Sequence, residues 1–388
     1  MKKKMIAGLA SLLALVVVVL CAGSFYFYHV AVARASKEFL SESPDLKTRP
    51  EVEESKETTL ADDEWWNSQN FERWDMDSED GIHLKAYYLP ATGPSDKTVI
   101  IAHGYSGNAT QMSSYARMYH EKWGYNVLLP DARGHGESGG DYIGFGWPER
   151  KDYLKWIGRV LDENGADSQI VLHGVSMGGA TVMMTSGEDL PPNVKAVVED
   201  CGYTSAKAEL SFQLRRMYRL PAFPIVETTS LLTKLRAGYF FGEASALEQV
   251  KKSKTPTLFI HGANDKFVPA EMVHEVYESC AAEKELYIVP KAGHGEAYRM
   301  DPETYEKTVA GFIGRFVQSI MDDNLTPKRL QHSNFEKGAI LVPIRNIYSK
   351  TDHPFVVAEG WPIHSLCMEH NSALPGHTKE TAGMLTKI

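Results

Sequence analysis

The chain has 388 residues, of which 43% are hydrophobic, so it is long enough to bury a large core. It carries 41 Lys and Arg against 50 Asp and Glu, a formal net charge of -9. That balance provides no broad basic face that could bind the phosphate backbone of a nucleic acid, so we expect no nucleic-acid partner. The length suits two domains as well as one large domain with appendages, and we expect one.

An apolar segment follows three lysines at positions 2–4. Residues 5–33 contain no Asp, Glu, Lys or Arg. A helix of about 20 apolar residues crosses a bilayer, whereas a cleaved signal has a shorter apolar run of roughly 7–15. We therefore predict a transmembrane anchor over residues 1–35, single-pass in the cell membrane, with the rest of the chain on the extracytoplasmic side. The A-x-A pattern at Ala31 to Ala33 leaves a cleaved signal, and hence secretion, as the alternative.

Residues 36–63 are rich in Glu, Lys, Ser and Thr and have almost no large apolar side chains. Such a composition cannot bury a core, so this segment is predicted to be a solvated polar linker.

Short aliphatic runs separated by helix-length segments follow the linker. A hairpin is predicted first, over Phe71–Asp77 and Ile82–Leu89. Six more strands are expected over Thr98–Ala102, Asn126–Pro130, Gln169–His173, Val194–Glu199, Thr257–His261 and Glu285–Val289. Helices are expected over Gly107–Lys122, Pro148–Asp162, Gly178–Ser186 and Ala270–Ala282. This alternation predicts an α/β fold, with a mostly parallel eight-stranded sheet, helices on both faces and the hairpin at one edge.

One interval between strands is much longer than the others. Residues 203–252 have a helical pattern rich in Leu, Phe, Tyr and Arg. An insertion of this size beyond the strand ends is predicted to form a lid.

A G-x-S-x-G pattern with Ser176 at its centre follows the strand that ends at His173. Between a strand and a helix this pattern forces the serine into a strained turn that exposes its hydroxyl. Gly174 and Gly178 are expected there because the backbones beside the turn come too close for a Cβ. By itself the pattern also fits an ordinary glycine-rich turn.

A serine hydroxyl becomes a good nucleophile only when an oriented base removes its proton. In such sheets the acid and the histidine follow the serine in that order, each after a strand. Asp265 follows the strand at Thr257–His261, and His294 follows the strand at Glu285–Val289. We therefore predict Ser176, Asp265 and His294 as the catalytic residues.

The oxyanion of an acyl-transfer reaction needs backbone donors. The N–H of Met177, directly after the serine, is predicted as one donor, and that of Tyr105, in the loop after Thr98–Ala102, as the other. His103 precedes the serine and is expected to be structural. No metal site is predicted, because neither the loop at Asp131 nor the C-terminal trio of His364, Cys367 and His370 supplies a full ligand set.

The cysteines at 21, 201, 280 and 367 form no CxxC pair and are expected to be isolated thiols, Cys201 and Cys280 as buried hydrophobes, although a disulfide is not excluded.

These residues resemble the α/β-hydrolases, specifically the branch with monoacylglycerol lipases, bacterial carboxylesterases and serine aminopeptidase-like proteins. The likeness runs from about Phe71 to Val317 and rests on HGYSG at His103, DARGHGES at Asp131, GVSMGG at Gly174, HGAND at His261 and AGH at Ala292. The resemblance implies a hydrolase domain over residues 64–323 that needs no cofactor or metal and forms an acyl-enzyme on Ser176. The tail, residues 324–388, lies outside it and has no predicted role.

The same fold serves many reactions, so the substrate follows from the residues around the site. The predicted lid supplies apolar side chains that suit an apolar acyl group, which favours a small-molecule carboxylic ester; they are Phe212, Leu214, Met217, Leu231, Leu232, Phe240 and Phe241. A peptidase, an amidase or a thioesterase is the alternative; Glu199 and Asp200 are the candidates for a charged subsite in a peptidase. A non-catalytic binding protein is the third hypothesis, and the presence of all three predicted catalytic residues disfavours it.

Overall fold

The structure is a computed structural model that describes residues 2–35, 37 and 53–318. Contacts divide the chain into one unit, Met1–Pro327, and a second, Lys328–Ile388, which lies outside the described residues. The predicted tail and its histidines and cysteine therefore also lie outside them.

Eight strands form one sheet in the order β1-β2-β4-β3-β5-β6-β7-β8. β1 pairs antiparallel with β2, and β2 pairs antiparallel with β4, whereas the remaining neighbours are parallel. The strands are β1 Glu72–Asp77, β2 His83–Leu89, β3 Lys97–Ala102, β4 Asn126–Pro130, β5 Gln169–Val175, β6 Val194–Asp200, β7 Thr257–Gly262 and β8 Lys284–Val289. The predicted sheet with its antiparallel edge hairpin is confirmed.

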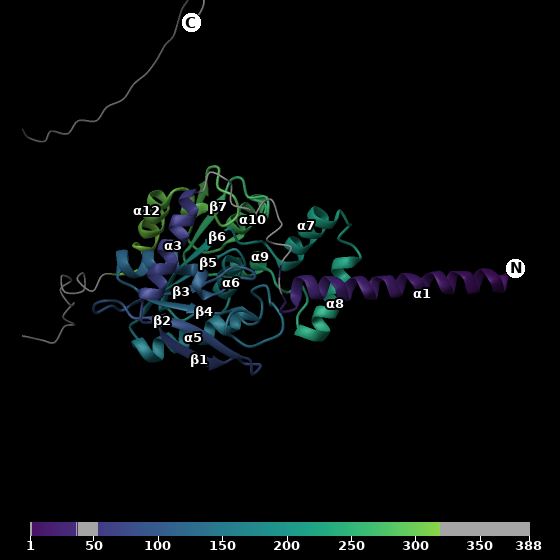
Figure 1. Ribbon diagram of the computed structural model, residues 1–388, viewed down its shortest axis with the longest axis horizontal. Coiled ribbons are helices and arrows are strands. Elements are labelled where there is room, and N and C mark those ends of the chain that lie inside the picture. Colours follow the sequence, from purple (N-terminus) through teal and green to yellow (C-terminus); the bar gives the residue numbers. More distant parts are fainter. Residues whose placement is uncertain (1, 36, 38–52, 319–388) are drawn as a thin grey trace, which may run out of the picture. The chain divides into compact units, whose positions relative to one another are not determined.

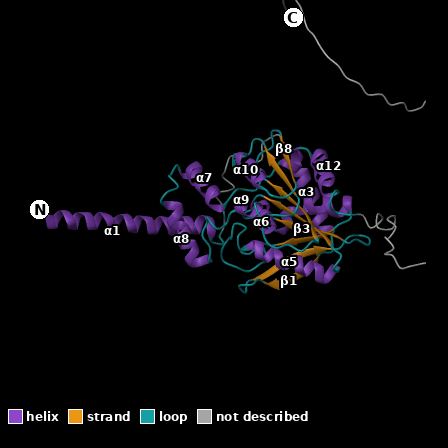
Figure 2. Ribbon diagram, turned by 180° about the vertical axis from the view of Figure 1, so that it is seen from behind, coloured by secondary structure: helices purple, strands orange, loops and turns teal. Residues whose placement is uncertain are grey.

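Helices cover both faces of this sheet (Figures 1 and 2). In β3, Val99 and Ile101 pack in the core of one face and Ile100 in that of the other, so the strand buries apolar side chains on both faces. The first face is covered by α3 Glu53–Ser68, η2 Ala109–Met112, α4 Ser113–Arg117, η3 Met118–Lys122, α11 Ala297–Met300 and α12 Pro302–Ile313. The second is covered by α5 Glu149–Asn164, α6 Met177–Ser186 and α10 Glu271–Ser279.

The long interval between β6 and β7 is helical, as predicted. It contains α7 Ala206–Tyr218, α8 Ile225–Ala237 and α9 Ala246–Val250. α7 begins at a Ser205 cap whose hydroxyl accepts the N–H of Ala208 at 3.1 Å, and it ends at Arg219, which has a left-handed backbone. We call residues 203–252 the helical insertion.

The N-terminal apolar segment forms helix α1, Lys2–Phe27, followed by a π-helical turn, η1, Tyr28–Val32. Among the described residues α1 is long and apolar enough to cross a membrane. Its 26 residues span roughly 39 Å at about 1.5 Å per residue, which exceeds the roughly 30 Å of a hydrocarbon core.

The predicted polar linker requires a correction, because α3 begins at Glu53 and therefore takes in residues 53–63. Two tryptophans at the end of this helix account for the difference. The Trp65 side chain is buried and its indole N–H donates to Glu121 at 2.7 Å, while Trp66 stacks on Phe71 with 4.1 Å between ring centres. Packing of this apolar end stabilises a helix whose first turns are polar.

Candidate active site

Ser176 stands at the sharp turn between β5 and α6. Its backbone has φ 58° and ψ -118°, a conformation that non-glycine residues rarely adopt. The surrounding structure holds it there: the N–H of Ser176 donates to the carbonyl of Asp200 at 2.8 Å, and the Ser176 carbonyl accepts the N–H of Ala180 at 3.0 Å in the first turn of α6. A strained serine at this place is typical of a nucleophile.

Two glycines allow the chain to make this turn. A Cβ on Gly174 would lie 2.1 Å from the carbonyl oxygen of Gly178, and a Cβ on Gly178 would lie 2.0 Å from the carbonyl oxygen of Ala102. Both obstacles are backbone atoms, which cannot rotate away as a side chain can. These are the close backbone approaches for which glycines were expected at positions 174 and 178.

We expect Gly178→Ala to destabilise the fold by about 3 kcal/mol or more, because the added methyl overlaps the end of β3. Gly158→Ala is the matched control, since Gly158 lies within α5 and a Cβ there would have no neighbour within 4 Å. Alanine in a helix is favoured over glycine by about 1 kcal/mol, so the control should be at least as stable as the natural chain. Thermal unfolding followed by circular dichroism checks this; equal melting temperatures for the two variants would contradict it.

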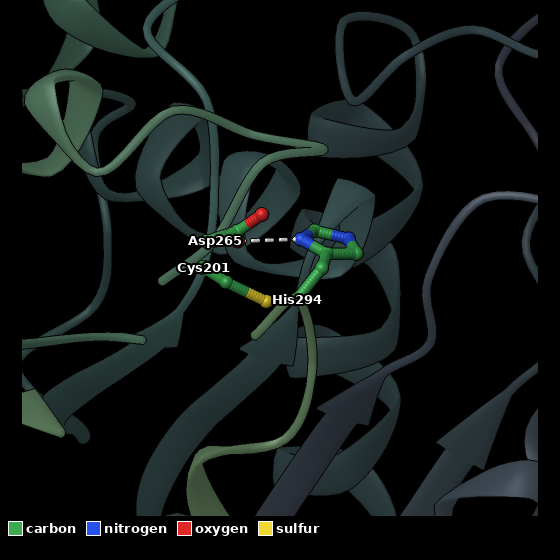
Figure 3. A group of neighbouring side chains, drawn as sticks. All are labelled: Cys201, Asp265 and His294. Carbon is green, nitrogen blue, oxygen red and sulfur yellow. Dashed lines mark hydrogen bonds and ion pairs between the residues drawn. The ribbon is translucent and has the colours of Figure 1, made fainter. Parts of the chain in front are cut away.

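The three predicted catalytic residues lie in one hydrogen-bonded row. Ser176 Oγ is 2.8 Å from His294 Nε2, and His294 Nδ1 is 2.7 Å from Asp265 Oδ2. Figure 3 shows the second of these contacts, with the Asp265 carboxyl facing the imidazole. Because a carboxylate only accepts, the proton of the imidazole belongs on Nδ1 and Nε2 is free to accept from the serine hydroxyl.

Asp265 is held by more groups than His294 alone. Its Oδ1 accepts the backbone N–H groups of Phe267 and Val268 at 2.8 and 2.9 Å. A second histidine, His261, approaches Oδ2 with its Nε2 at 3.2 Å. Burial would raise the pKa of Asp265, but the two histidines outweigh burial and lower it well below its ordinary value. The carboxylate is therefore ionised at any neutral pH. The motif around His261 was noted in the sequence, but its contact with Asp265 was not predicted.

The predicted oxyanion donors belong to two segments beside the serine, the start of α6 and the loop after β3. Met177 is the first residue of α6, where backbone N–H groups have no acceptor within the helix. Gly104, directly before Tyr105, lies against the nucleophile, since a Cβ on it would be 3.4 Å from the Cβ of Ser176. The loop after β3 therefore reaches the serine, as the sequence predicts.

A largely apolar cavity of about 100 Å³ opens beside Ser176. A single water needs roughly 10–15 Å³ of such space, so the cavity has room for a substrate group. The helical insertion supplies one side, with Leu210, Leu214, Met217, Ile225 and Val226. The end of the N-terminal helix, formed by the last residue of α1 and by η1, supplies Phe27, Val30 and Ala31. Of the apolar insertion residues that the sequence singled out, Leu214, Met217 and Phe241 line it, whereas Leu231 is exposed on the outside.

Glu209 is a cavity residue that the sequence did not indicate. Its side chain lines the cavity and is only 5% exposed. Its Oε1 accepts from Gln213 Nε2 at 2.6 Å, and its Oε2 has no hydrogen-bond partner among the described residues. Burial raises the pKa of Glu209 to about 8. No motif surrounds this residue; only its place on α7, facing inward, distinguishes it.

The raised pKa of Glu209 predicts a pH-dependent stability. Since the folded chain holds the proton more tightly than the unfolded chain, stability is full below the ordinary pKa near 4.5 and is lost as pH rises through about 8. Glu209→Gln keeps an acceptor for Gln213 and cannot ionise. We expect it to raise the melting temperature by about 4 °C or more at pH 9 and much less at pH 5. Glu275→Gln, exposed on α10, should show no such difference. An equal gain for Glu209→Gln at both pH values would contradict the prediction.

Other candidate residues have structural partners. His103, expected to be structural, is buried, with Nδ1 2.8 Å from the Gly104 carbonyl and Nε2 accepting from the N–H of Ala132 at 3.0 Å. Asp131 accepts the backbone N–H groups of Ala109 and Glu137, which fits the predicted hydrogen-bonded loop. Glu199 and Asp200 are fully buried and do not line the cavity, so they do not form the charged subsite considered for a peptidase.

A metal bound among the described residues would have to share the hydrogen-bonded row. Within the described part of the chain, the candidate ligand group is Cys201, Asp265 and His294, whose donor atoms lie within 4.8 Å of one another (Figure 3). His294 Nδ1 and Asp265 Oδ2 already bind each other, and burial raises the pKa of the Cys201 thiol well above its ordinary value, which disfavours the thiolate that binds metals. Cys201 and Cys280 are free and buried, as expected.

Comparisons with known proteins agree with this fold. Residues 99–308 match the alpha/beta hydrolase family. The uncharacterized protein YqkD of Bacillus subtilis (strain 168) is 32% identical over 233 residues, which cover 60% of this chain and 76% of YqkD. The uncharacterized membrane protein YNL320W of Saccharomyces cerevisiae is 23% identical over 239 residues, 60% of this chain and 76% of that protein. The solved Pyrococcus furiosus esterase Pf2001 is similar with a TM-score of 0.54 and 25% identity, over 65% of this chain and 94% of the esterase.

The narrower resemblance to monoacylglycerol lipases stays a prediction, because the names of these relatives do not identify that branch. The matched residues 99–308 make up more than half of the chain and contain most of β3, all of β4 to β8, the helical insertion and all three residues of the hydrogen-bonded row. This chain belongs to the alpha/beta hydrolase family.

Proposed function

We propose that this hydrolase cleaves carboxylic esters through an acyl-enzyme on Ser176. The observation that carries the proposal is the row from Ser176 Oγ through His294 to Asp265, with contacts of 2.8 and 2.7 Å, beside a cavity with a mainly apolar lining. The row supplies an oriented base for the serine, and the cavity supplies a place for an acyl group.

In the first half of the reaction, Ser176 Oγ attacks the ester carbonyl carbon while His294 Nε2 takes the hydroxyl proton. The carbonyl oxygen gains negative charge, and the N–H groups of Tyr105 and Met177 are proposed to stabilise it. Asp265 stabilises the imidazolium through Nδ1. The tetrahedral intermediate then collapses, the bond to the alcohol breaks, and His294 returns the proton to the departing alcohol.

The second half repeats these steps with water. His294 takes a proton from a water molecule, whose oxygen attacks the acyl carbon, and then returns that proton to Ser176 Oγ as the carboxylic acid leaves. The serine hydroxyl is regenerated, so the cycle needs no other reactant.

An ester is favoured over a peptide by the surroundings of Ser176. The side chains that would surround an acyl group in the cavity are mostly aliphatic and aromatic. Among the described residues that line the cavity, Glu209 carries the carboxyl group, which is buried and has a raised pKa. The similar solved structure Pf2001 is an esterase. If Glu209 instead binds a substrate amine, the chain is a peptidase or amidase, which is the second candidate.

Turnover of p-nitrophenyl acyl esters, compared with aminoacyl amides, separates these candidates. The full chain, purified in detergent, should hydrolyse the esters and should be labelled by a fluorophosphonate probe. Preference for the amides would support the second candidate. No labelling of the folded protein would favour a non-catalytic binding protein.

We also propose that α1 anchors the chain in the cell membrane with the hydrolase domain on the extracytoplasmic side. The three lysines before the apolar segment support this orientation, and the similar yeast protein is named a membrane protein. Membrane fractions should release the chain with detergent and retain it in high salt; release by salt alone would refute the anchor.

A further inference from the structure

The residues after α1 are packed into the catalytic domain. Val32 is fully buried, and its carbonyl accepts the N–H of Ile143 at 2.7 Å. The backbone N–H of Arg34 donates to Asp141 at 2.8 Å, while its guanidinium donates to the carbonyls of Ser138 and Gly136, each at 2.7 Å. The end of the N-terminal segment is thus part of the hydrolase domain.

The same segment forms a wall of the cavity beside Ser176. Phe27, Val30 and Ala31 line it together with the nucleophile. The hydroxyl of Tyr105, the residue that supplies a proposed oxyanion donor, donates to the carbonyl of Ala31 at 2.8 Å. A group bound in this cavity therefore lies between the end of the N-terminal helix and the helical insertion.

The outer face of the helical insertion is apolar next to α1. Phe223 is 73% exposed and Leu235 is 77% exposed, and Leu231, one helical turn before Leu235, shares its face of α8. α1 touches this insertion: the Phe27 and Tyr218 rings lie 5.1 Å apart, and the Arg236 guanidinium is 5.5 Å from the Phe25 ring. Figures 1 and 2 show α7 and α8 at the side of the domain from which α1 extends. The helix that carries Leu231 and Leu235 thus packs beside the proposed membrane anchor.

An excess of positive charge distinguishes the helical insertion from the chain as a whole. The helical insertion, residues 203–252, contains eight Lys and Arg and four Glu, of which Glu209 is buried, whereas the whole chain has a net charge of -9. Apolar side chains with basic neighbours are typical of surfaces that lie in the headgroup region of an anionic bilayer.

We propose that the outer face of the helical insertion rests on the bilayer that α1 crosses, and that the substrate is an ester-linked lipid of that bilayer. Its acyl chain would enter the cavity between the insertion and the end of the N-terminal helix. This inference rests on the proposed function and the proposed anchor, and it adds the substrate class and the source of the substrate.

Two variants of the full chain test it, each with a matched control. Leu231→Glu/Leu235→Glu places charge on the outer face, and its control, Leu60→Glu, places charge at an exposed leucine on α3. Ala31→Phe fills the cavity wall, and its control, Ala7→Phe, lies on the exposed part of α1. The readout is the ratio of turnover of p-nitrophenyl palmitate in vesicles to that of p-nitrophenyl acetate in solution. The vesicles contain equal parts phosphatidylcholine and phosphatidylglycerol.

We expect the ratio to fall by about tenfold or more in the Leu231→Glu/Leu235→Glu variant and in Ala31→Phe, and to stay unchanged in both controls. Because α1 remains in every variant, a fall reports on the insertion or the cavity and not on loss of the anchor. The inference is overturned if either variant matches its control. In that case hydrolysis of the acetate ester still supports the proposed function, whereas a natural chain that hydrolyses neither ester overturns both.

Discussion

Replacing Ser176 by alanine is expected to lower kcat on ester substrates by about 10⁴-fold or more and to abolish fluorophosphonate labelling. The reason is geometric, since Ser176 Oγ is the hydroxyl within 2.8 Å of His294 Nε2 and no other group at the turn can form the acyl-enzyme. His294→Ala should cost a similar factor. The double variant should be no worse than either single variant, because nucleophile and base act as one unit.

Ser211→Ala is the matched control for this experiment. Ser211 lies on α7 near the cavity, but its hydroxyl donates to Lys207 of its own helix at 2.6 Å and it does not line the cavity. Labelling and turnover should both survive that change. Ester turnover by Ser176→Ala at the natural rate would refute the proposed mechanism, and a double variant much slower than both single variants would show that His294 acts apart from the serine.

Most of the sheet could be predicted from the sequence, because β3 to β7 are short, mainly apolar runs that are buried on both faces. β4 was predicted with the residues that the structure gives it, Asn126–Pro130, and all five are buried. α3 was not predicted, because its first turns are polar and its position depends on Trp65 and Trp66 near its end. The local composition of residues 53–63 predicts a linker, whereas the tertiary contacts of two tryptophan rings stabilise a helix.

The hydrogen-bonded row could be predicted for a related reason. Ser176, Asp265 and His294 each follow a parallel strand, and such strands end at the same edge of the sheet. The cavity could not be predicted in the same way. Glu209 lies on α7, and Ala31 lies 145 residues before the nucleophile, so only the packing of the insertion and the N-terminal segment brings them to the site.

Asp265→Asn is expected to lower kcat by about 10⁴-fold while leaving the fold in place. Asparagine has the same shape, but its amide can present an N–H to His294 and so favour the imidazole form with its proton on Nε2, which cannot accept from Ser176. The effect should appear in kcat for esters of every chain length, because Asp265 is 7% exposed and is not among the residues that line the cavity.

Asp301→Asn is the control, because Asp301 caps α12 by accepting the N–H of Thr304 at 3.1 Å and asparagine caps a helix equally well. Its kcat should not change. If Asp265→Asn also kept the natural kcat, a different group would have to orient His294. His261 cannot replace the carboxylate. Its Nε2 lies 3.2 Å from Asp265 Oδ2, the same oxygen that binds His294, so His261 interacts with Asp265 and not with His294 Nδ1. A large loss of kcat in Asp265→Asn, in which His261 is unchanged, would therefore assign the orienting role to the carboxylate. The contact of His261 with Asp265 Oδ2 is then expected to hold that carboxylate in position.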